Sequence, residues 1–265
     1  SSIYAGSYGW ASAGRFHHAQ SQIHRFLNCL GGYTKSVNTY SYAAAEVILP
    51  HVIGVDAAKI MTQQTSWSSI VNKAKLMVSF GGFPTGNSQI SNGGVSDHIQ
   101  VDFLRQASSK GISLISIAPR QSIVDKAEQI EWIKARPNSD TALILGICHT
   151  LLQESLYNIN FLKKFTVGYE KFFQYLTGQS DGVIKNADWA EQLSGVSSSE
   201  IMSLARRMAN TPTMLSITWS LTRQENGEQA YWAVIALAAM LGQMGKPGVG
   251  VGFGYTVSNY LGNNV

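Results

Sequence analysis

A carboxylate stands where a long apolar segment begins. Asp140 directly follows Asn138 and Ser139, and mainly apolar residues continue from there to position 152. An acidic residue at such a place commonly accepts hydrogen bonds from the first N–H groups of its own helix. A carboxylate also has enough lone pairs to accept from the N1–H and the amino group of a guanine ring. The pattern alone favours the helix cap and leaves the guanine site open.

Three further residues have the types that surround a reacting group. Ser41 stands just before a second apolar segment, where its hydroxyl is expected to cap a helix. Tyr8 and Trp10 lie in a glycine-bearing stretch, either as anchors in a core or as the wall of a substrate pocket. The sequence alone leaves both interpretations of the aromatic pair open.

The two cysteines, Cys29 and Cys148, are far apart, which excludes a disulfide framework. Because there is no Cys-x-x-Cys pair, this segment is expected to hold no ligand set for zinc or for an iron–sulfur cluster. His149 follows Cys148 inside a segment predicted to be helical. Adjacent helix positions do not face each other, so we interpret this pair as packing and not as a nucleophile with its base.

The composition is apolar and poor in charge. Hydrophobic residues make up 45% of the 265 positions and charged residues only 14%, where about 25% is usual. This deficit indicates a surface covered by other protein or by a ligand, although a glycine-rich α/β protein with an ordinary core would also show it. The net charge of +4 comes without a dense basic run, so no nucleic-acid partner is expected. No apolar run has the length of a transmembrane helix.

The apolar periodicity predicts the elements that must position these residues. Residues 76–80 and 112–117 read as buried strands, separated by a loop at 81–87 and an amphipathic helix at 96–110. A strand, a helix and a strand in this order form a βαβ unit with parallel strands. Further elements are expected along the chain: helices at 14–30 and 42–53, a short strand at 130–133, helices at 140–154, at 161–176 with a break at Gly168 and at 198–208, a strand at 214–218, a helix at 227–241 and a glycine-rich loop at 242–254.

The alternation predicts an α/β fold with a doubly wound, mostly parallel sheet and helices on both faces. We expect this Rossmann-like domain to span residues 51–225. Residues 1–50 are expected to belong to an adjacent lobe, to which residues 226–265 return as a helix and a glycine-rich loop. The sequence begins without a methionine or a signal peptide, so we expect a piece of a longer protein.

Ligands of such a sheet bind beyond the carboxyl ends of its strands. Those ends are predicted at Gly81–Asn87, at Ala118–Arg120 and at Trp219–Arg223. The first loop lacks the Gly-x-Gly-x-x-Gly pattern, so a nicotinamide or flavin fingerprint is missing. Gly86 and Asn87 could still present backbone N–H groups to a phosphate, although glycines that only form a tight turn give the same pattern.

The ordered set of segments resembles the dimethyl sulfoxide reductase family of molybdopterin guanine dinucleotide oxidoreductases, which includes biotin sulfoxide and trimethylamine N-oxide reductases. The likeness runs along the whole chain, which corresponds to the central part of such enzymes. The matching stretches are 4–10, 31–33, 40–41, 64–67, 140–146 with 149–150, 219–220, 223, 227–229 and 237–243.

The resemblance implies roles for single residues. Ser41 falls on the position of a serine ligand of molybdenum, which reverses the helix-cap interpretation. Tyr8 and Trp10 fall on aromatic positions near the reacting group, and Trp10 also contacts the cofactor. The remaining implied cofactor contacts are Gly86, Asn87, Ala118, Pro119, Asn138, Ser139, Asp140, Trp219, Ser220 and Arg223. Many relatives carry a lysine where Gly86 stands and an aspartate where Ala118 stands.

The implied cofactor is molybdenum bis(molybdopterin guanine dinucleotide), and the implied reaction is oxygen-atom transfer from an S-oxide or N-oxide. The implied partners are the remaining domains of a parent enzyme and an electron donor that the sequence does not indicate. Without those domains the piece is expected to be inactive and to self-associate. A bacterial periplasmic or cytoplasmic enzyme fits equally well. The alternative is a non-catalytic guanine-nucleotide-binding or structural module derived from the same fold.

Overall fold

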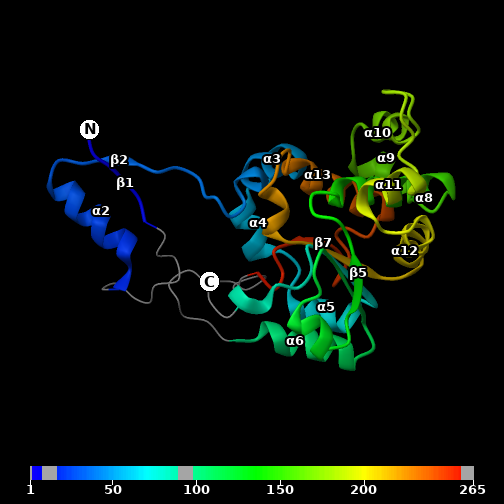
Figure 1. Cartoon of the computed structure of the whole chain (residues 1–265), viewed down its shortest axis with the longest axis horizontal. Coiled ribbons are helices and arrows are strands. Elements are labelled where there is room, and N and C mark those ends of the chain that lie inside the picture. Colours follow the sequence, from blue (N-terminus) through cyan, green and yellow to red (C-terminus); the bar gives the residue numbers. More distant parts are fainter. Residues whose placement is uncertain (1, 8–16, 89–97, 258–265) are drawn as a thin grey trace.

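The computed structural model describes residues 2–7, 17–88 and 98–257. Its centre is a five-stranded parallel sheet with the strand order β5-β4-β3-β6-β7 (Figure 1). The strands are β3 (Leu76–Phe80), β4 (Ser113–Ala118), β5 (Glu131–Lys134), β6 (Thr213–Ile217) and β7 (Gly250–Phe253).

The chain winds in two directions from the central strand β3. It first runs outward through α6 (Gln100–Ser109) to β4 and through α7 (Ile123–Ala127) to β5. It then returns to place β6 on the other side of β3, and β7 beyond β6. The direction therefore reverses between β3 and β6, and this is the point where open α/β sheets bind their ligands.

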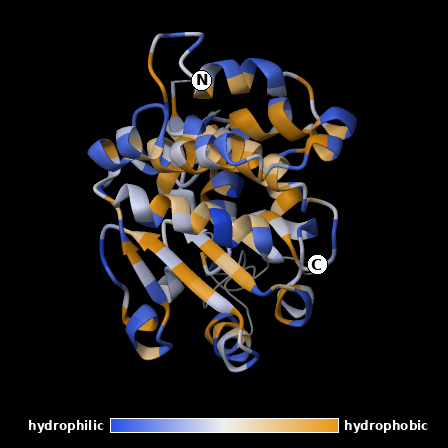
Figure 2. Ribbon diagram, turned by 90° about the vertical axis from the view of Figure 1, so that its right-hand side faces the viewer, coloured by the Kyte–Doolittle hydropathy of each residue, from blue (hydrophilic) through white to orange (hydrophobic). Residues whose placement is uncertain are grey.

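Each face of the sheet has its own hydrophobic core, because successive side chains of a strand point to opposite faces. Val78 and Phe80 of β3 pack into the larger core, with the helices that follow β5 and β6. Met77 packs into the smaller core, with α5 (Trp67–Lys73), α6 and α7. Figure 2 shows hydrophobic stretches along the strands and in the helices packed against them. The predicted doubly wound sheet with helices on both faces is confirmed.

The remaining helices surround this sheet. One helical layer lies over the larger core, where α8 contacts α11, α12 and α13, and α13 contacts α3 (Figure 1). The bounds are α3 (Ala43–Ile53), α4 (Ala57–Gln63), α5 (Trp67–Lys73), α8 (Asp140–Gln153), α9 (Ile159–Phe165), α10 (Tyr169–Leu176), α11 (Ala187–Ser194), α12 (Ser198–Asn210) and α13 (Glu228–Leu241), with 3-10 turns η1 (Thr85–Asn87) and η2 (Trp219–Thr222).

The first part of the chain stands apart from this body. It consists of β1 (Tyr4–Ala5), α2 (Ala19–Cys29) and β2 (Thr34–Lys35), at the left of Figure 1. Leu27 is the buried residue of α2, whereas Phe26 and Leu30 are exposed by 62% and 61%. This segment therefore exposes apolar side chains that its own elements do not cover. Among the described residues, no helix is long and apolar enough to cross a membrane.

The glycine-rich segment at 242–254 was predicted to be a loop, and this is wrong for its last part. Residues 250–253 form β7, which pairs with β6. Gln64 holds the outer edge of β7: its Nε2 donates to the Phe253 carbonyl at 3.0 Å, and the Phe253 N–H donates to its Oε1 at 2.7 Å. Gly252 is needed there, because a Cβ would lie 2.2 Å from Tyr255 Cε2 and 2.9 Å from Gln64 Oε1. Because Gly250 and Gly252 carry no apolar side chains, the sequence of β7 lacks the hydrophobic pattern that predicts a strand.

The helix boundaries differ slightly from the expectations. The break at Gly168 is present, with a left-handed φ of 83° between α9 and α10. The helix expected at 96–110 is described from Gln100 onward. Since α13 contacts α8 and β7 extends the sheet, residues 228–253 share the core of the preceding segment. The division of the chain at residues 50 and 225 stays a prediction.

Candidate cofactor site

The loops at the carboxyl edge of the sheet are tied to one another by the backbone. The Gly81 N–H donates to the Ile117 carbonyl at 2.8 Å, and the Thr218 N–H donates to the Phe80 carbonyl at 2.9 Å. The Gly254 N–H donates to the Ile217 carbonyl at 2.9 Å. The parallel ladder thus continues past the strand ends, so the loops after β3, β4, β6 and β7 form one connected edge.

Two glycines open the loop after β3. Gly81 and Gly82 have φ angles of 91° and 76°, a region that other residues rarely adopt. A Cβ on Gly81 would collide with the Thr218 hydroxyl, and one on Gly82 would lie 2.9 Å from Ser116 Oγ. The loop therefore lies directly against β4 and against the turn after β6. The backbone N–H and carbonyl groups of this loop therefore lie close to any ligand that binds at the carboxyl edge of the sheet.

The turn after β6 presents an indole without a hydrogen-bond partner. Trp219 begins η2, and its Nε1 is buried and unpaired. The Thr218 and Ser220 hydroxyls lie 2.7 Å apart, and the Arg223 N–H donates to the Ser220 carbonyl at 3.1 Å. Ser220 and Arg223 are exposed. This predicted cofactor turn thus has one buried donor and an exposed cation at the switch point of the sheet.

Ser41 reaches this edge through its neighbour in sequence. Tyr42 is the N-cap residue of α3, and its ring centroid lies 4.5 Å from that of Trp219. The half-buried Ser41 is therefore not the cap, and the interpretation from pattern alone is wrong. Its backbone N–H donates to Thr39 Oγ1 at 3.1 Å, and its hydroxyl has no hydrogen bond to a described residue. A hydroxyl in this state is available to a ligand or a metal.

Asp140 is the first residue of α8 and does not cap it. The cap position belongs to Ser139, whose hydroxyl donates to the Arg136 carbonyl at 2.7 Å, and no side chain caps this helix. Asn138 turns the chain with a φ of 63°. Asp140 is 8% exposed, and burial raises the pKa of its carboxyl to about 6, partly offset by its own backbone N–H. The carboxyl therefore changes protonation state near neutral pH.

The other predicted site residues are less informative. Tyr8 and Trp10 lie outside the described residues. Gly86 is exposed in η1, next to Asn87. Ala118 ends β4, where its carbonyl accepts a hydrogen bond from Trp132 Nε1 at 2.9 Å, and Pro119 is exposed. These loops begin at the same edge of the sheet as the loops that carry Asp140 and Trp219.

Unpaired buried polar atoms concentrate near this edge, and sequence reasoning missed most of them. They are Asp125 Oδ1, Ser216 Oγ, Trp219 Nε1 and Thr256 Oγ1, and among the described residues only Tyr33 Oη joins them, in the segment that stands apart. Buried polar groups are normally hydrogen-bonded, so such a cluster indicates groups that a ligand or water completes. Apart from Trp219, no motif marks these residues in the sequence.

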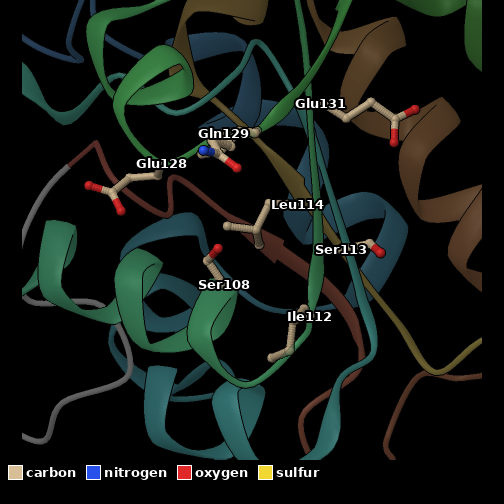
Figure 3. Close-up of a pocket in the computed structure, with 8 residues that line it drawn as sticks. Ser108, Ile112, Ser113, Leu114, Glu128, Gln129 and Glu131 are labelled. Atoms are coloured by element: carbon tan, nitrogen blue, oxygen red, sulfur yellow. The ribbon is translucent and has the colours of Figure 1, made fainter.

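A pocket of about 180 Å³ lies at the other end of the strands, where β4 and β5 begin (Figure 3). Sites for small molecules usually measure about 300–1,000 Å³, so this pocket is too small for a dinucleotide. Its lining residues are Ser108, Ile112, Ser113, Leu114, Glu128, Gln129, Ile130 and Glu131. None of them belongs to a loop at the carboxyl edge.

Comparison with known proteins identifies the family of this chain. The profile of the molybdopterin oxidoreductase family matches residues 1–263. The chain belongs to the molybdopterin oxidoreductase family. Similar members of this family are a biotin sulfoxide reductase of Cereibacter sphaeroides, 40% identical over 96% of this chain and 34% of that protein, and a trimethylamine-N-oxide reductase of Haemophilus influenzae, 38% identical over 97% and 31%. The resemblance predicted from the motifs is confirmed.

Two further comparisons define the extent of the match. A dimethyl sulfoxide/trimethylamine N-oxide reductase of Cereibacter sphaeroides is 39% identical over 97% of this chain and 31% of its own length. Acetylene hydratase from Pelobacter acetylenicus shares the fold, with a TM-score of 0.58 over 84% of this chain and 28% of that chain, at 24% identity. This molybdopterin oxidoreductase chain thus spans about a third of the length of the curated relatives it matches.

Proposed function

We propose that this chain holds the guanine nucleotide of a bis(molybdopterin guanine dinucleotide) cofactor within a longer molybdenum oxotransferase. The observation that carries the proposal is the carboxyl of Asp140, which is buried at the end of the loop after β5 and caps no helix. A buried carboxyl without a side-chain partner is costly unless a ligand donates hydrogen bonds to it. Guanine offers two adjacent donors of the right kind.

The arrangement of the strands fits an extended ligand. Asp140 follows β5 and Trp219 follows β6, three strand spacings away, which corresponds to about 14 Å in a sheet. A dinucleotide with its guanine at Asp140 would run along the carboxyl edge towards Trp219 and the cation of Arg223. The backbone of Gly86 and Asn87, and residues Ala118 and Pro119, would line its path. Asn138 and Ser139 would shape the turn at the guanine.

Ser41 is the residue that we assign as the protein ligand of molybdenum. Two observations support this assignment: its hydroxyl has no hydrogen bond to a described residue, and the ring of the next residue, Tyr42, packs against Trp219. When bound, the cofactor supplies oxygen-atom transfer from an S-oxide or N-oxide, the substrates named for the relatives. The Tyr8 hydroxyl would donate a hydrogen bond to the substrate oxygen, and Trp10 would exclude water beside it. We assign no iron–sulfur cluster to this segment.

We further propose that the remaining domains of the parent enzyme cover the apolar surface of β1, α2 and β2. The exposed side chains of Tyr4, Phe26 and Leu30 support this, because large exposed apolar patches mark interfaces. The isolated chain would then be inactive, because it lacks the other parts of the site, and it would self-associate. Turnover of biotin sulfoxide by the purified chain would contradict this.

The guanine assignment is tested by Asp140→Asn in the protein that carries this chain, expressed in a bacterium that makes the cofactor. Asparagine keeps the size but turns a donor towards a donor, so the guanine content per folded protein should fall about tenfold or more, since one lost charge-assisted hydrogen bond is worth roughly 1.5–3 kcal/mol. The control is Asp188→Asn, which changes an exposed acid in the first turn of α11. Equal guanine content in both variants would contradict the proposal.

The metal assignment separates an oxotransferase from a non-catalytic nucleotide module. Ser41→Ala should change the visible absorption spectrum of the molybdenum centre and leave the thermal midpoint nearly unchanged. Ser66→Ala is the matched control, because the Ser66 hydroxyl caps α5 by accepting from the Ser69 N–H at 3.3 Å. That variant should lower the midpoint and leave the spectrum intact. An unchanged spectrum in Ser41→Ala would remove Ser41 as the ligand.

A further inference from the structure

Thr256, just after β7, combines three features that rarely occur together. Its side chain is 0% exposed, and its hydroxyl has no hydrogen-bond partner. Its φ is 64°, in the left-handed region. A β-branched residue rarely adopts this conformation, and such outliers cluster at ligand sites where the surrounding structure enforces them. Residue 256 therefore has the profile of a functional position.

The surrounding contacts explain how the strained turn is enforced. The Val257 N–H donates to the Gly254 carbonyl at 3.0 Å, which closes the turn around Thr256. The Tyr255 hydroxyl donates to the Thr65 carbonyl, and the Tyr255 ring meets the Trp67 ring edge-on at 5.3 Å. These contacts fix the backbone of Thr256 and leave its hydroxyl unused. The hydroxyl is therefore not what holds the turn.

A second unpaired donor lies beside this turn. Gly254 has a φ of 78°, and a Cβ there would collide with Nε1 of Trp219. The indole edge thus rests on the backbone two residues before Thr256. Trp219 Nε1 can only donate a hydrogen bond, and it is buried without an acceptor. Two unused donors, from the ends of β6 and β7, therefore lie in one small region next to the switch point between β3 and β6.

We propose that Trp219 Nε1 and the Thr256 hydroxyl donate hydrogen bonds to phosphate oxygens of the bound guanine dinucleotide. This inference rests on the proposed function and adds Thr256 to its binding residues. Two donors require an acceptor-rich group, and a pyrophosphate is the acceptor-rich part of that ligand. The pyrophosphate of a dinucleotide also belongs at the switch point of a doubly wound sheet. The cation of Arg223 on the same turn favours an anion.

The test compares two ligands and two substitutions at residue 256. The purified chain is titrated with GDP and with guanosine by calorimetry. Thr256→Val removes the hydroxyl, keeps the shape and should weaken GDP binding about tenfold, the effect of one lost charge-assisted hydrogen bond. It should leave guanosine binding unchanged. Thr256→Ser keeps the hydroxyl and should bind GDP within about twofold of the parent chain, well below the tenfold loss.

Thr213→Val provides the control for a structural role. Thr213 is 1% exposed at the start of β6, and its hydroxyl donates to the Thr211 carbonyl at 2.8 Å. Losing that bond should lower the thermal midpoint and leave GDP affinity unchanged. Thr256→Val should show the reverse, because removing an unpaired buried hydroxyl does not destabilise a protein. A trapped water at Thr256 would instead predict no change in GDP affinity.

The outcomes separate the two proposals. A chain that binds neither guanosine nor GDP overturns the proposed function and this inference with it. A chain that binds guanosine, but whose GDP affinity is the same in Thr256→Val, overturns the inference alone. A fall in midpoint for Thr256→Val equal to that of Thr213→Val also overturns it, because the hydroxyl would then have a protein partner. A loss confined to GDP supports it.

Discussion

The rings of Tyr42 and Trp219 pack against each other at a tilt of 42°, with their centroids 4.5 Å apart, and join the start of α3 to the turn after β6. This contact connects the segment that carries Ser41 to the switch point of the sheet. It is the link through which a residue from the first fifth of the chain reaches the edge where the other predicted cofactor residues lie. Aromatic pairs of this kind contribute roughly 0.5–1.5 kcal/mol beyond the area they bury.

Removing this contact should loosen the start of α3. We expect Tyr42→Ala to lower the free energy of unfolding by about 1–3 kcal/mol, since it removes a half-buried aromatic ring from a packed pair. Urea denaturation followed by circular dichroism measures the change. The control is Val37→Ala, because Val37 is 84% exposed and its truncation should shift the value by less than about 0.5 kcal/mol. Equal effects in both variants would show that the Tyr42–Trp219 contact contributes nothing to stability.

The buried carboxyl of Asp140 should make the stability of the empty chain depend on pH. Burial raises its pKa from 3.8 to about 6, so the folded state binds a proton more tightly than the unfolded state. The contribution of Asp140 to stability is then greatest below about pH 4, is lost as the pH rises towards 6, and stays level above, with a total loss of about 3 kcal/mol for a shift of roughly two units. Thermal midpoints between pH 4 and pH 8 measure this.

Asp140→Asn should remove that dependence. At pH 7.5 the variant should be more stable than the parent chain, and at pH 4 the two should be similar. Guanosine binding should show the opposite trend in the parent chain, rising as the pH passes 6, because the ionised carboxyl is the form that accepts both hydrogen bonds. A stability difference that is the same at both pH values would argue against a buried, ionisable Asp140.

The loop after β3 should tolerate no side chain at its first glycine. Gly81→Ala places a residue at a φ of 91° and drives its Cβ into the Thr218 hydroxyl. We expect a loss of about 1–3 kcal/mol of unfolding free energy from the backbone strain, with more from the collision. Gly86→Ala is the control, because nothing lies within 4 Å of a Cβ there. Chemical denaturation of both variants gives the comparison, and similar values would contradict the close approach.

Gln64 should protect the outer edge of β7. We expect Gln64→Ala to increase amide hydrogen exchange at Phe253 and to cost about 1–3 kcal/mol, because the Phe253 N–H and carbonyl both lose a partner. Gln63→Ala changes an exposed residue of the same type one position earlier and should leave Phe253 protected. Mass-spectrometric exchange of the peptide that contains residue 253 provides the readout. Unchanged protection would show that the edge does not depend on Gln64.

The centre of the sheet could be predicted from the sequence because it is continuous in apolar residues. The runs that contain Val78, Ile115 and Leu215 are buried on both faces, and they predicted β3, β4 and the neighbouring strand β6. By contrast, β7 was missed because Gly250 and Gly252 give it no hydrophobic pattern. Its place in the sheet depends on side chains far away in sequence, such as Gln64.

The candidate site shows the same division between local and distant information. Local pattern placed Asp140 at the start of a helix correctly, but it predicted a cap, because burial of the carboxyl cannot be seen in sequence. The resemblance to a family pointed to Ser41 against local pattern, and Tyr42, not Ser41, is indeed the cap residue of α3. Thr256 has no local signal, since its strain and its unpaired hydroxyl arise from the fold around it.

The winding of the sheet also sets the order in which the molecule can form. Leu76 of β3 pairs with Thr213 of β6, and 213 − 76 places the partners 137 residues apart. A ribosome adds about 5–20 residues per second, so β6 is synthesised roughly 7–27 s after β3, and one edge of β3 stays unpaired during that time. Contacts this distant in sequence make folding slow. The pairing of β3 with β6 is therefore completed late, after β4 and β5 have been synthesised. The edge proposed to bind the cofactor thus cannot receive it before most of the chain has been made.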